Sequence, residues 1–239
     1  MRYLGSKNKI SKELAPIIQS YITEETKGYL EPFVGGANMI DKIKCDNKIG
    51  CDIHQELIAL LKKARDEVDD IPNVIMEDEY YKVKNNKQNY PKWYVGLVGF
   101  CASFGAKYFG GYARDSKNDT TGKWSRGAIK NLKKQAKNLS NIKFKSCSFT
   151  ELPKDKIKGY VIYCDIPYRG TTKYKTDSFP YEEFYEWVKE MSVNNTVLIS
   201  EYSMPEEFEC VWEKSVTTNL DSLRTTASER VEKLFTYKN

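Results

Sequence analysis

The spacing of apolar side chains predicts that the first third of this 239-residue chain forms alternating helices and strands. Residues 10–22 and 56–68 repeat apolar side chains three and four positions apart, which is the spacing of one helix face packed against a core. Residues 29–33 and 48–53 are short apolar runs, as buried strands are. A glycine-rich turn and a short helical pattern over residues 40–43 separate these strands. This order predicts the opening of a nucleotide-binding α/β sheet.

One almost continuously apolar run, residues 160–164, predicts a further strand that is covered on both faces. Such runs are typical of parallel sheets, because both faces of these sheets are packed against helices. After it, the pattern predicts a helix over residues 181–191 and three strands, over residues 196–200, 209–216 and 233–237. Both halves of the chain are therefore expected to contribute strands to one sheet.

The residues between these two halves differ in composition and predict an inserted lobe. Residues 71–139 are polar, aromatic and rich in asparagine, lysine and glycine, and their centre, residues 105–127, predicts a loop or irregular structure. At about 150 residues per domain, the chain is long enough for one domain with an insertion. We expect residues 1–70 and 140–239 to form the sheet domain and residues 71–139 to form the insertion.

Composition and cysteine usage exclude several classes of protein. Hydrophobic residues at 40% and charged residues at 30% are typical of a globular domain. The longest apolar run, residues 95–106, is shorter than the roughly 20 residues of a membrane-spanning helix, and the first residues contain no apolar signal segment. Six cysteines form no C-x-x-C pair, and His54 is the one histidine. We expect a cytoplasmic protein with reduced thiols, no membrane segment, no metal, and no Ser-His-Asp or Cys-His catalysis.

A mild excess of positive charge is concentrated in one stretch of the chain. The net charge is +5, from 38 lysines and arginines against 33 acidic residues. The basic stretch comprises Lys123, Arg126, Lys130, Lys133, Lys134 and Lys137. Such a stretch can contact the phosphates of a nucleic acid, and it is equally typical of a solvated helix face.

The turn after the first strand and the end of the second strand carry residues suited to a nucleotide-like ligand. In Glu31-Pro32-Phe33-Val34-Gly35-Gly36, two adjacent glycines allow the backbone to approach a ligand closely. Asp52, where the second strand ends, can accept hydrogen bonds from both hydroxyls of a ribose. The dinucleotide pattern G-x-G-x-x-G is absent from this turn, which disfavours a nicotinamide-dependent oxidoreductase. Taken alone, the glycines would also suit a tight turn, and Asp52 a helix cap.

Directly after the apolar strand, Asp165-Ile166-Pro167-Tyr168 combines a carboxylate, a rigid X-Pro turn and an aromatic ring. The residue before a proline is held extended, so the carbonyl of Ile166 has a restricted direction. That carbonyl and the side chain of Asp165 can together accept both hydrogens of one planar amino group, while Tyr168 stacks on the attached ring. The alternative is a strand-ending turn in which Asp165 caps a helix.

These segments, in this order, resemble the Dam-type adenine-N6 DNA methyltransferases. The resemblance rests on Tyr3-Leu4-Gly5-Ser6-Lys7, residues 31–36, Asp52 and Asp165-Ile166-Pro167-Tyr168. Residues 104–112, rich in aromatic side chains and glycine, are similar to the target-recognition segment of that family, so the likeness covers nearly the whole chain. It implies a Rossmann-like α/β sheet of the S-adenosylmethionine-dependent methyltransferase type, with an inserted, mainly helical target-recognition lobe.

The resemblance also implies a reaction and roles for individual residues. The reaction is methyl transfer from S-adenosylmethionine to the N6 amino group of an adenine, which must be flipped out because a stacked base cannot reach the site. The implied catalytic residues are Asp165, Ile166, Pro167 and Tyr168. The implied cofactor-binding residues are Tyr3, Lys7, Glu31, Pro32, Phe33, Gly35, Gly36, Asp52, Ile53, Ser148, Phe149 and Asp165.

The implied partner is double-stranded DNA, bound by a monomer or a weak homodimer. The candidate DNA-binding residues are Lys107, Tyr112, Arg114, Lys117, Lys123, Trp124, Arg126 and Lys130. Among them, Arg114 and Arg126 are the candidates for reading bases, because a guanidinium can bind guanine through two hydrogen bonds.

Two departures from the family pattern keep other functions open. Ile166 replaces the first proline of the catalytic motif, and Ser148 stands where the family often has an aspartate that contacts the adenine of the cofactor. Both are compatible with a homologue that binds DNA and has lost catalysis. Methylation of another amine, on cytosine N4 or in RNA, is a further alternative, although Asp165 favours adenine because those enzymes more often carry serine or asparagine.

Overall fold

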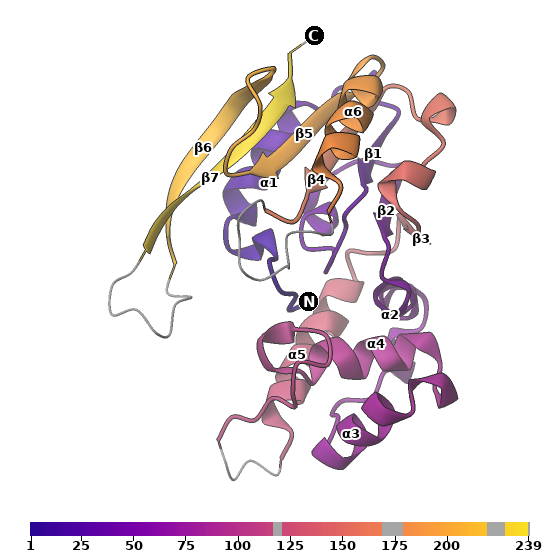
Figure 1. Ribbon diagram of the computed structural model, residues 1–239. Coiled ribbons are helices and arrows are strands. Elements are labelled where there is room, and N and C mark those ends of the chain that lie inside the picture. Colours follow the sequence, from indigo (N-terminus) through magenta and orange to yellow (C-terminus); the bar gives the residue numbers. More distant parts are fainter. Residues whose placement is uncertain (117–120, 169–178, 219–227, 239) are drawn as a thin grey trace.

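The computed structural model describes residues 1–116, 121–168, 179–218 and 228–238 of the chain (Figure 1). These residues form one seven-stranded sheet with helices packed on its two faces, and a mainly helical lobe at one end (Figure 1). Of the sequence-based candidates for DNA binding, Lys117 lies outside the described residues.

The sheet has the strand order β3-β2-β1-β4-β5-β7-β6. Its strands are β1 (Gly28–Glu31), β2 (Lys48–Asp52), β3 (Ile142–Ser146), β4 (Tyr160–Asp165), β5 (Thr196–Glu201), β6 (Phe208–Thr218) and β7 (Ser228–Tyr237). The first five strands along the chain are parallel, and β7 lies antiparallel between β5 and β6. The predicted α/β sheet, and every strand predicted from an apolar run, is confirmed.

The described residues contain six α-helices. They are α1 (Ser11–Ser20), α2 (Gln55–Asp66), α3 (Glu77–Asn85), α4 (Lys92–Cys101), α5 (Lys123–Ala136) and α6 (Tyr181–Ser192). The three helices predicted from apolar spacing correspond to α1, α2 and α6. The short helical pattern after the first strand is a single 3-10 turn, Ile40–Lys42. Residues 123–127, predicted as irregular, instead begin α5, because Ser125, Ala128 and Ile129 are buried on one helix face.

Strand β3, at the edge of the sheet, has no continuous apolar run and was not predicted. Its sequence alternates, with Ile142 and Phe144 buried and Lys143 and Lys145 exposed. It pairs in parallel with β2, and an edge strand with one face in water alternates between apolar and polar side chains. Five residues of alternation are too few to separate such a strand from a loop.

Alternate residues of the central strand β4 pack into two separate hydrophobic cores. Val161 and Tyr163 belong to the core that contains α1 and α2, whereas Ile162 and Cys164 belong to the core that contains α6. Successive side chains of a strand point to opposite faces of its sheet. Burial of both faces therefore explains why this strand is apolar almost throughout.

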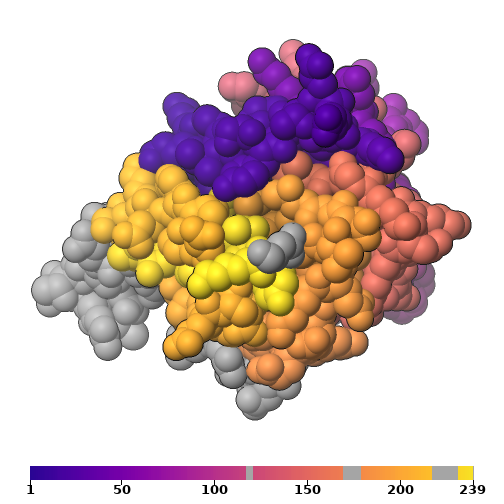
Figure 2. All heavy atoms as spheres, turned by 90° about the horizontal axis from the view of Figure 1, so that it is seen from above, coloured from indigo at the N-terminus to yellow at the C-terminus, as the bar shows by residue number. Residues whose placement is uncertain are grey.

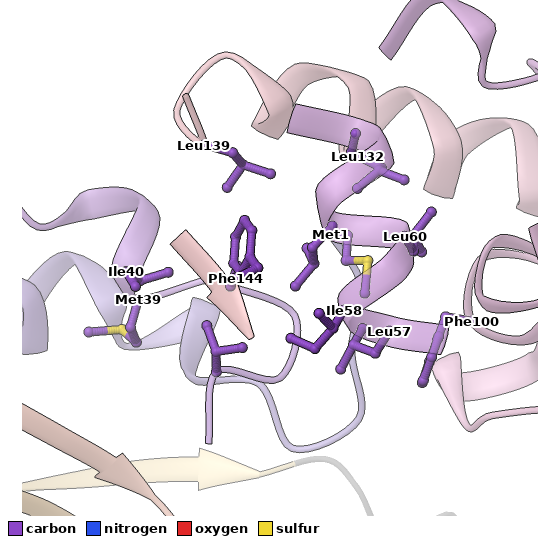
Figure 3. Close-up of a cluster of buried hydrophobic side chains, with 14 of the residues drawn as sticks. Met1, Met39, Ile40, Leu57, Ile58, Leu60, Phe100, Leu132, Leu139 and Phe144 are labelled. Atoms are coloured by element: carbon purple, nitrogen blue, oxygen red, sulfur yellow. The ribbon is translucent and has the colours of Figure 1, made fainter. Parts of the chain in front are cut away.

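The core on the α2 side of the sheet continues into the helical lobe. Figure 3 shows Leu57 and Leu60 of α2 in the same cluster as Phe100 of α4, Leu132 of α5 and Phe144 of β3. None of these side chains is more than 3% exposed. Because burial of apolar surface is the main force that holds elements together, this shared core attaches the lobe to the sheet.

The N-terminal segment and the C-terminal hairpin are far apart in sequence and lie side by side. Figures 1 and 2 show the indigo N-terminal segment with α1 against the orange and yellow strands β6 and β7. Glu13 of α1 forms an ion pair with Lys214 of β6. This packing brings the residues that precede α1 close to β7.

Glycine at position 96 allows α2 and α4 to pack closely. A Cβ atom at Gly96 would lie 2.2 Å from the backbone oxygen of Glu56. We expect Gly96→Ala to lower the free energy of unfolding by about 1–3 kcal/mol, as overpacked cores do. As a matched control, Gly127→Ala in α5 places its Cβ where no atom lies within 4 Å, and it should raise this free energy by about 0.5–1 kcal/mol. Urea denaturation measures both, and changes of the same sign would contradict the argument.

Candidate active site at the carboxyl ends of the parallel strands

Three acidic side chains lie where parallel strands end at the same edge of the sheet. Glu31 ends β1, Asp52 ends β2 and Asp165 ends β4. β1 lies between β2 and β4, and the strand order changes direction between β1 and β4. Open α/β sheets bind their ligands at such a switch point, outside the carboxyl ends of the strands. The sequence-based candidates from all three strands are therefore brought to one edge.

Lys7 provides the positive charge in contact with Asp165. Its Nζ lies 3.3 Å from Oδ1 of Asp165 and 3.2 Å from Oε2 of Glu232 in β7. The side chain of Lys7 is 8% exposed, so these contacts are shielded from water. Burial lowers the pKa of Lys7, but the charges of Asp165 and Glu232 outweigh it, and the pKa is raised above its ordinary value. The ammonium therefore stays charged while two carboxylates share it.

The Asp165 carboxylate keeps some access to solvent, with 22% of its side chain exposed. Burial raises the pKa of this carboxyl, and the Lys7 ammonium partly offsets the effect. The next residue, Ile166, packs its side chain into the α6-side core and is 3% exposed. An apolar side chain is thus accommodated where the family carries its first proline. The carbonyl of Pro167 accepts a 2.8 Å hydrogen bond from the Tyr181 hydroxyl, which anchors the turn to α6.

Tyr168 is held from three directions. Its hydroxyl donates a 2.9 Å hydrogen bond to Oε2 of Glu232. The Lys7 ammonium lies over its ring, 4.0 Å from the centroid, and the ring of Tyr202 meets it edge to face at 4.4 Å. These contacts fix the orientation of the ring next to Asp165.

Glu31, at the end of β1, is a buried carboxyl. It is 3% exposed and accepts a 2.8 Å hydrogen bond from the hydroxyl of Tyr29. Burial raises the pKa of Glu31 well above 4.5, although the bond from Tyr29 acts in the opposite direction. The folded protein consequently holds a proton on Glu31 at pH values where the unfolded chain has released it.

This proton makes the stability depend on pH in a defined direction. Where the folded state binds more protons than the unfolded state, the free energy of unfolding falls as the pH rises, from about 4.5 up to the folded-state pKa. Glu31→Gln carries no such proton and still accepts from Tyr29. We expect its stability relative to the wild type, measured by urea denaturation, to improve as the pH is raised above about 5. A difference that does not change with pH would contradict a raised pKa.

The glycine turn after β1 is shaped by Tyr3. Gly35 has a backbone φ of +47°, in the left-handed region that favours glycine. A Cβ atom at Gly35 would lie 2.9 Å from the Tyr3 ring, and one at Gly36 would lie 2.7 Å from Cβ of Tyr3. The N-terminal segment therefore lies directly against this turn, and a larger side chain at either position would push it away.

Asp52 braces the same turn from β2. Its Oδ2 accepts a 3.1 Å hydrogen bond from the amide of Gly35, and its Oδ1 accepts a 2.9 Å bond from the amide of His54. Burial raises the pKa of Asp52 above its ordinary value, and the two hydrogen bonds from backbone amides offset only part of this rise. The next side chain, Ile53, is 75% exposed. An uncovered apolar side chain beside a carboxylate suits a ligand with a flat ring and neighbouring hydroxyls.

Ser148 and Phe149 follow β3: Ser148 caps a short 3-10 turn, and Phe149 is buried. The amide of Ser148 donates to Glu151 and its hydroxyl accepts from Thr150, which forms a capping box at the start of a 3-10 turn. Phe149 is 4% exposed and lies 5.6 Å from the ring of Phe33, next to the turn after β1. The structure brings these residues to the edge that carries Asp52, since Ser146 of β3 is paired with Asp52.

The candidate DNA-binding residues that the structure describes lie in the lobe, and several form contacts within it. Arg114 pairs with Glu77, Lys123 pairs with Asp115, and Tyr112 donates to the carbonyl of Ile75. Exposed ion pairs are weak enough for a phosphate to replace the carboxylate. Three further candidates, Lys107, Arg126 and Lys130, are exposed.

Trp124 belongs to an exposed stack that sequence reasoning did not find. The guanidinium of Arg2 lies 4.2 Å from the Trp124 ring, and the ring of Phe104, which is 68% exposed, stacks at 6.5 Å. Beside this stack is a hollow of about 870 Å³ between the N-terminal segment and α5, lined also by Lys134 and Lys137. A basic hollow beside exposed aromatic rings suits a nucleic-acid strand.

Glu232 is a further residue of the site that the sequence analysis did not identify. No motif marks it, because it is one of four charged residues in β7 and nothing in its neighbours distinguishes it from the others. Its proximity to Lys7 and Tyr168 arises only when β7 enters the sheet beside β5.

Within the described ranges, no helix is long and apolar enough to cross a membrane, and no group of three or more histidine, cysteine or acidic side chains is placed to hold a metal ion.

The strand order and the acidic residues at the strand ends are those of a doubly wound α/β protein with a ligand site at its switch point, and the fold is consistent with the S-adenosylmethionine-dependent methyltransferases. Over residues 3–224 the chain matches the family of D12 class N6 adenine-specific DNA methyltransferases, and it belongs to that family. The resemblance noted in the sequence is confirmed at the level of the family, which makes the protein an adenine-specific DNA methyltransferase. A comparison with curated proteins found no match.

Proposed function

We propose that this enzyme transfers a methyl group from S-adenosylmethionine to the N6 amino group of an adenine flipped out of double-stranded DNA. The observation that carries the proposal is the cluster of Asp165, Lys7 and Tyr168 beyond the end of β4. It lies at the switch point of the sheet, next to the strand that leads into the glycine turn. A carboxylate and an aromatic ring held there suit a planar base that carries an amino group.

The residues around the turn fit the polar parts of S-adenosylmethionine. The carboxylate oxygens of Asp52 each accept one amide and keep a further lone pair, so they can accept both ribose hydroxyls. The turn of residues 31–36, whose two glycines pack directly against Tyr3, would enclose the methionine part. Lys7, at the end of the same N-terminal segment, would lie beside it.

Apolar residues of the same edge would hold the adenine ring of the cofactor. Ile53 offers an exposed apolar face, and Phe33 and Phe149 pack together behind the turn. The hydroxyl of Ser148 accepts from Thr150, so its own hydrogen can be donated to a ring nitrogen. This hydroxyl would replace the contact that an aspartate makes elsewhere in the family.

Asp165 and the Ile166 carbonyl would act on the target base. S-adenosylmethionine supplies an electrophilic methyl group on a sulfonium. Asp165 and the carbonyl accept the two N–H groups of the adenine, which localises electron density on N6. Asp165 would also accept the N–H proton that the amine gives up when the methyl group is transferred and the sulfonium becomes a neutral thioether. Fixed geometry and preorganised acceptors provide most of the acceleration.

Residues 71–139 would form the DNA-recognition part, with residues 1–70 and 140–239 as the catalytic part. The exposed stack around Trp124 and the basic hollow support this division, because both lie where the lobe meets the N-terminal segment. Phosphate contacts from the lobe lysines would position the DNA, and base contacts would select the site.

The proposal is tested by incubating the protein with labelled S-adenosylmethionine and methylation-free DNA, followed by mass spectrometry of the nucleosides. N6-methyladenine as the labelled product supports it. N4-methylcytosine as the labelled product would show that the site acts on the amine of cytosine, and it would contradict the proposed adenine specificity. Label in RNA but not in DNA, or no labelled nucleoside at all, would contradict it.

A further inference from the structure

Glu232 occupies a place that neither the catalytic motif nor the family match explains. It lies in β7, beyond the matched residues 3–224, and its side chain is 14% exposed. Its Oε2 accepts the hydroxyl of Tyr168 at 2.9 Å and pairs with Nζ of Lys7 at 3.2 Å. A half-buried carboxylate that contacts both Tyr168 and Lys7, the ion-pair partner of Asp165, is a candidate for a role in the reaction.

Lys7 is shared almost equally between two carboxylates. Its Nζ is 3.3 Å from Asp165 and 3.2 Å from Glu232. An ammonium group has three hydrogens to donate, so both contacts can exist together. Without Glu232, Asp165 would be the carboxylate left to neutralise the ammonium of Lys7. Because a buried ammonium is poorly hydrated, it would hold that carboxylate tightly.

This sharing matters because Asp165 has to accept a different donor during the reaction. The amino group of the target base needs a lone pair of the Asp165 carboxylate, and Lys7 contacts one of its oxygens. Lys7 also lies over the ring of Tyr168, 4.0 Å from its centroid, where it covers one face. Because Glu232 also contacts Lys7, the ammonium keeps a counter-ion when the base displaces it from Asp165.

Glu232 acts on Tyr168 through the hydroxyl. The bond fixes the phenol at the end opposite the backbone, so the ring cannot swing away from Asp165. Because Tyr168 and Lys7 share this carboxylate, the ring and the ammonium are positioned together.

We propose that Glu232 is a positioning residue: it retains Lys7 when the target amine displaces that ammonium from Asp165, and it anchors Tyr168 against the flipped base. The inference rests on the proposed function, since it assigns Glu232 a part in the same reaction.

The test compares Glu232→Gln with Glu213→Gln. Glutamine keeps the length of Glu232 and still accepts from Tyr168, but it removes the charge that retains Lys7. Glu213 lies on the neighbouring strand β6, is 63% exposed and is paired with Lys233, so its variant is the control. We expect Glu232→Gln to lower kcat by about tenfold or more, with KM for DNA and for the cofactor changed less than about threefold. Glu213→Gln is expected to match the wild type, and all three proteins to have similar Tm values.

A double-mutant cycle with Lys7→Met separates this role from a structural one. In the Lys7→Met background no ammonium remains to compete for Asp165, so Glu232→Gln should then lower kcat by much less. If the double variant lost kcat by the product of the two single-variant factors, the inference would be overturned and the proposed function left intact. A Glu232→Gln variant with wild-type kcat would have the same consequence. A wild type that makes no N6-methyladenine overturns both.

Discussion

Replacing Asp165 with alanine is expected to lower kcat for methyl transfer by about a thousandfold. The exocyclic amine of adenine is a poor nucleophile because its lone pair is delocalised into the ring. Asp165 is the carboxylate that ends β4, and in the proposed mechanism its removal would leave the amine with the Ile166 carbonyl alone. The loss of a preorganised acceptor in a partly buried site costs roughly two to three powers of ten in rate. Single-turnover transfer of labelled methyl groups to DNA measures this effect.

A second variant, Asp165→Asn, keeps the shape of the side chain and removes its charge. Asparagine retains one oxygen and places an amide donor opposite the amine, so it should also be strongly impaired. Both variants are expected to fold, because Lys7 keeps Glu232 as its counter-ion at 3.2 Å. Unchanged Tm values with retained DNA binding would establish that the loss is chemical. Activity within about tenfold of the wild type would contradict a catalytic role for Asp165.

Replacing Asp52 with alanine is expected to raise the Kd for S-adenosylmethionine by about a hundredfold. Hydrogen bonds to a charged group each contribute about 1.5–3 kcal/mol, and the loss of two ribose contacts amounts to roughly 3 kcal/mol or more. A change of about 1.4 kcal/mol is tenfold in affinity. The variant also releases the amide of Gly35, which loosens the turn on the cofactor side. Isothermal titration calorimetry with the cofactor measures the effect.

Two further variants sharpen the result at Asp52. Asp52→Asn keeps an acceptor for one backbone amide and should lose less affinity than the alanine variant. Asp155→Ala, at an exposed aspartate in the Lys154–Lys156 turn, is the matched control and is expected to bind like the wild type. An Asp52→Ala variant with a Kd within about threefold of the wild type would show that the ribose lies elsewhere.

Local sequence patterns were sufficient for the strands that build the site. Each is a short apolar run that ends at a recognisable residue: β1 before Pro32, β2 at Asp52 and β4 at Asp165. Proline lacks the amide that a ladder needs, and a charged residue leaves the apolar layer, so both mark strand ends. Since parallel strands end at one edge, the placement of the site followed from the same pattern.

Other elements could not be predicted because their pattern of apolar residues is weak or also occurs in loops. Strand β3 has only Ile142 and Phe144 as buried apolar residues, and α5 begins in a stretch of glycine, lysine and arginine. Arg2 belongs to no motif, and the motif that contains Phe104 does not reveal that both side chains lie against Trp124. Their positions depend on how the N-terminal segment crosses the lobe.

The sequence by itself determined the class of fold, the edge of the sheet that carries the site, and the family to which the enzyme belongs. These features depend on residues that are neighbours in the chain, whose spacing reports burial and backbone geometry directly. Only the tertiary structure decided that Glu232 meets Lys7 and Tyr168, across 225 and 64 positions of sequence. That contact requires β7 to enter antiparallel between β5 and β6, and strand pairing over such distances is settled by the packing of the whole sheet.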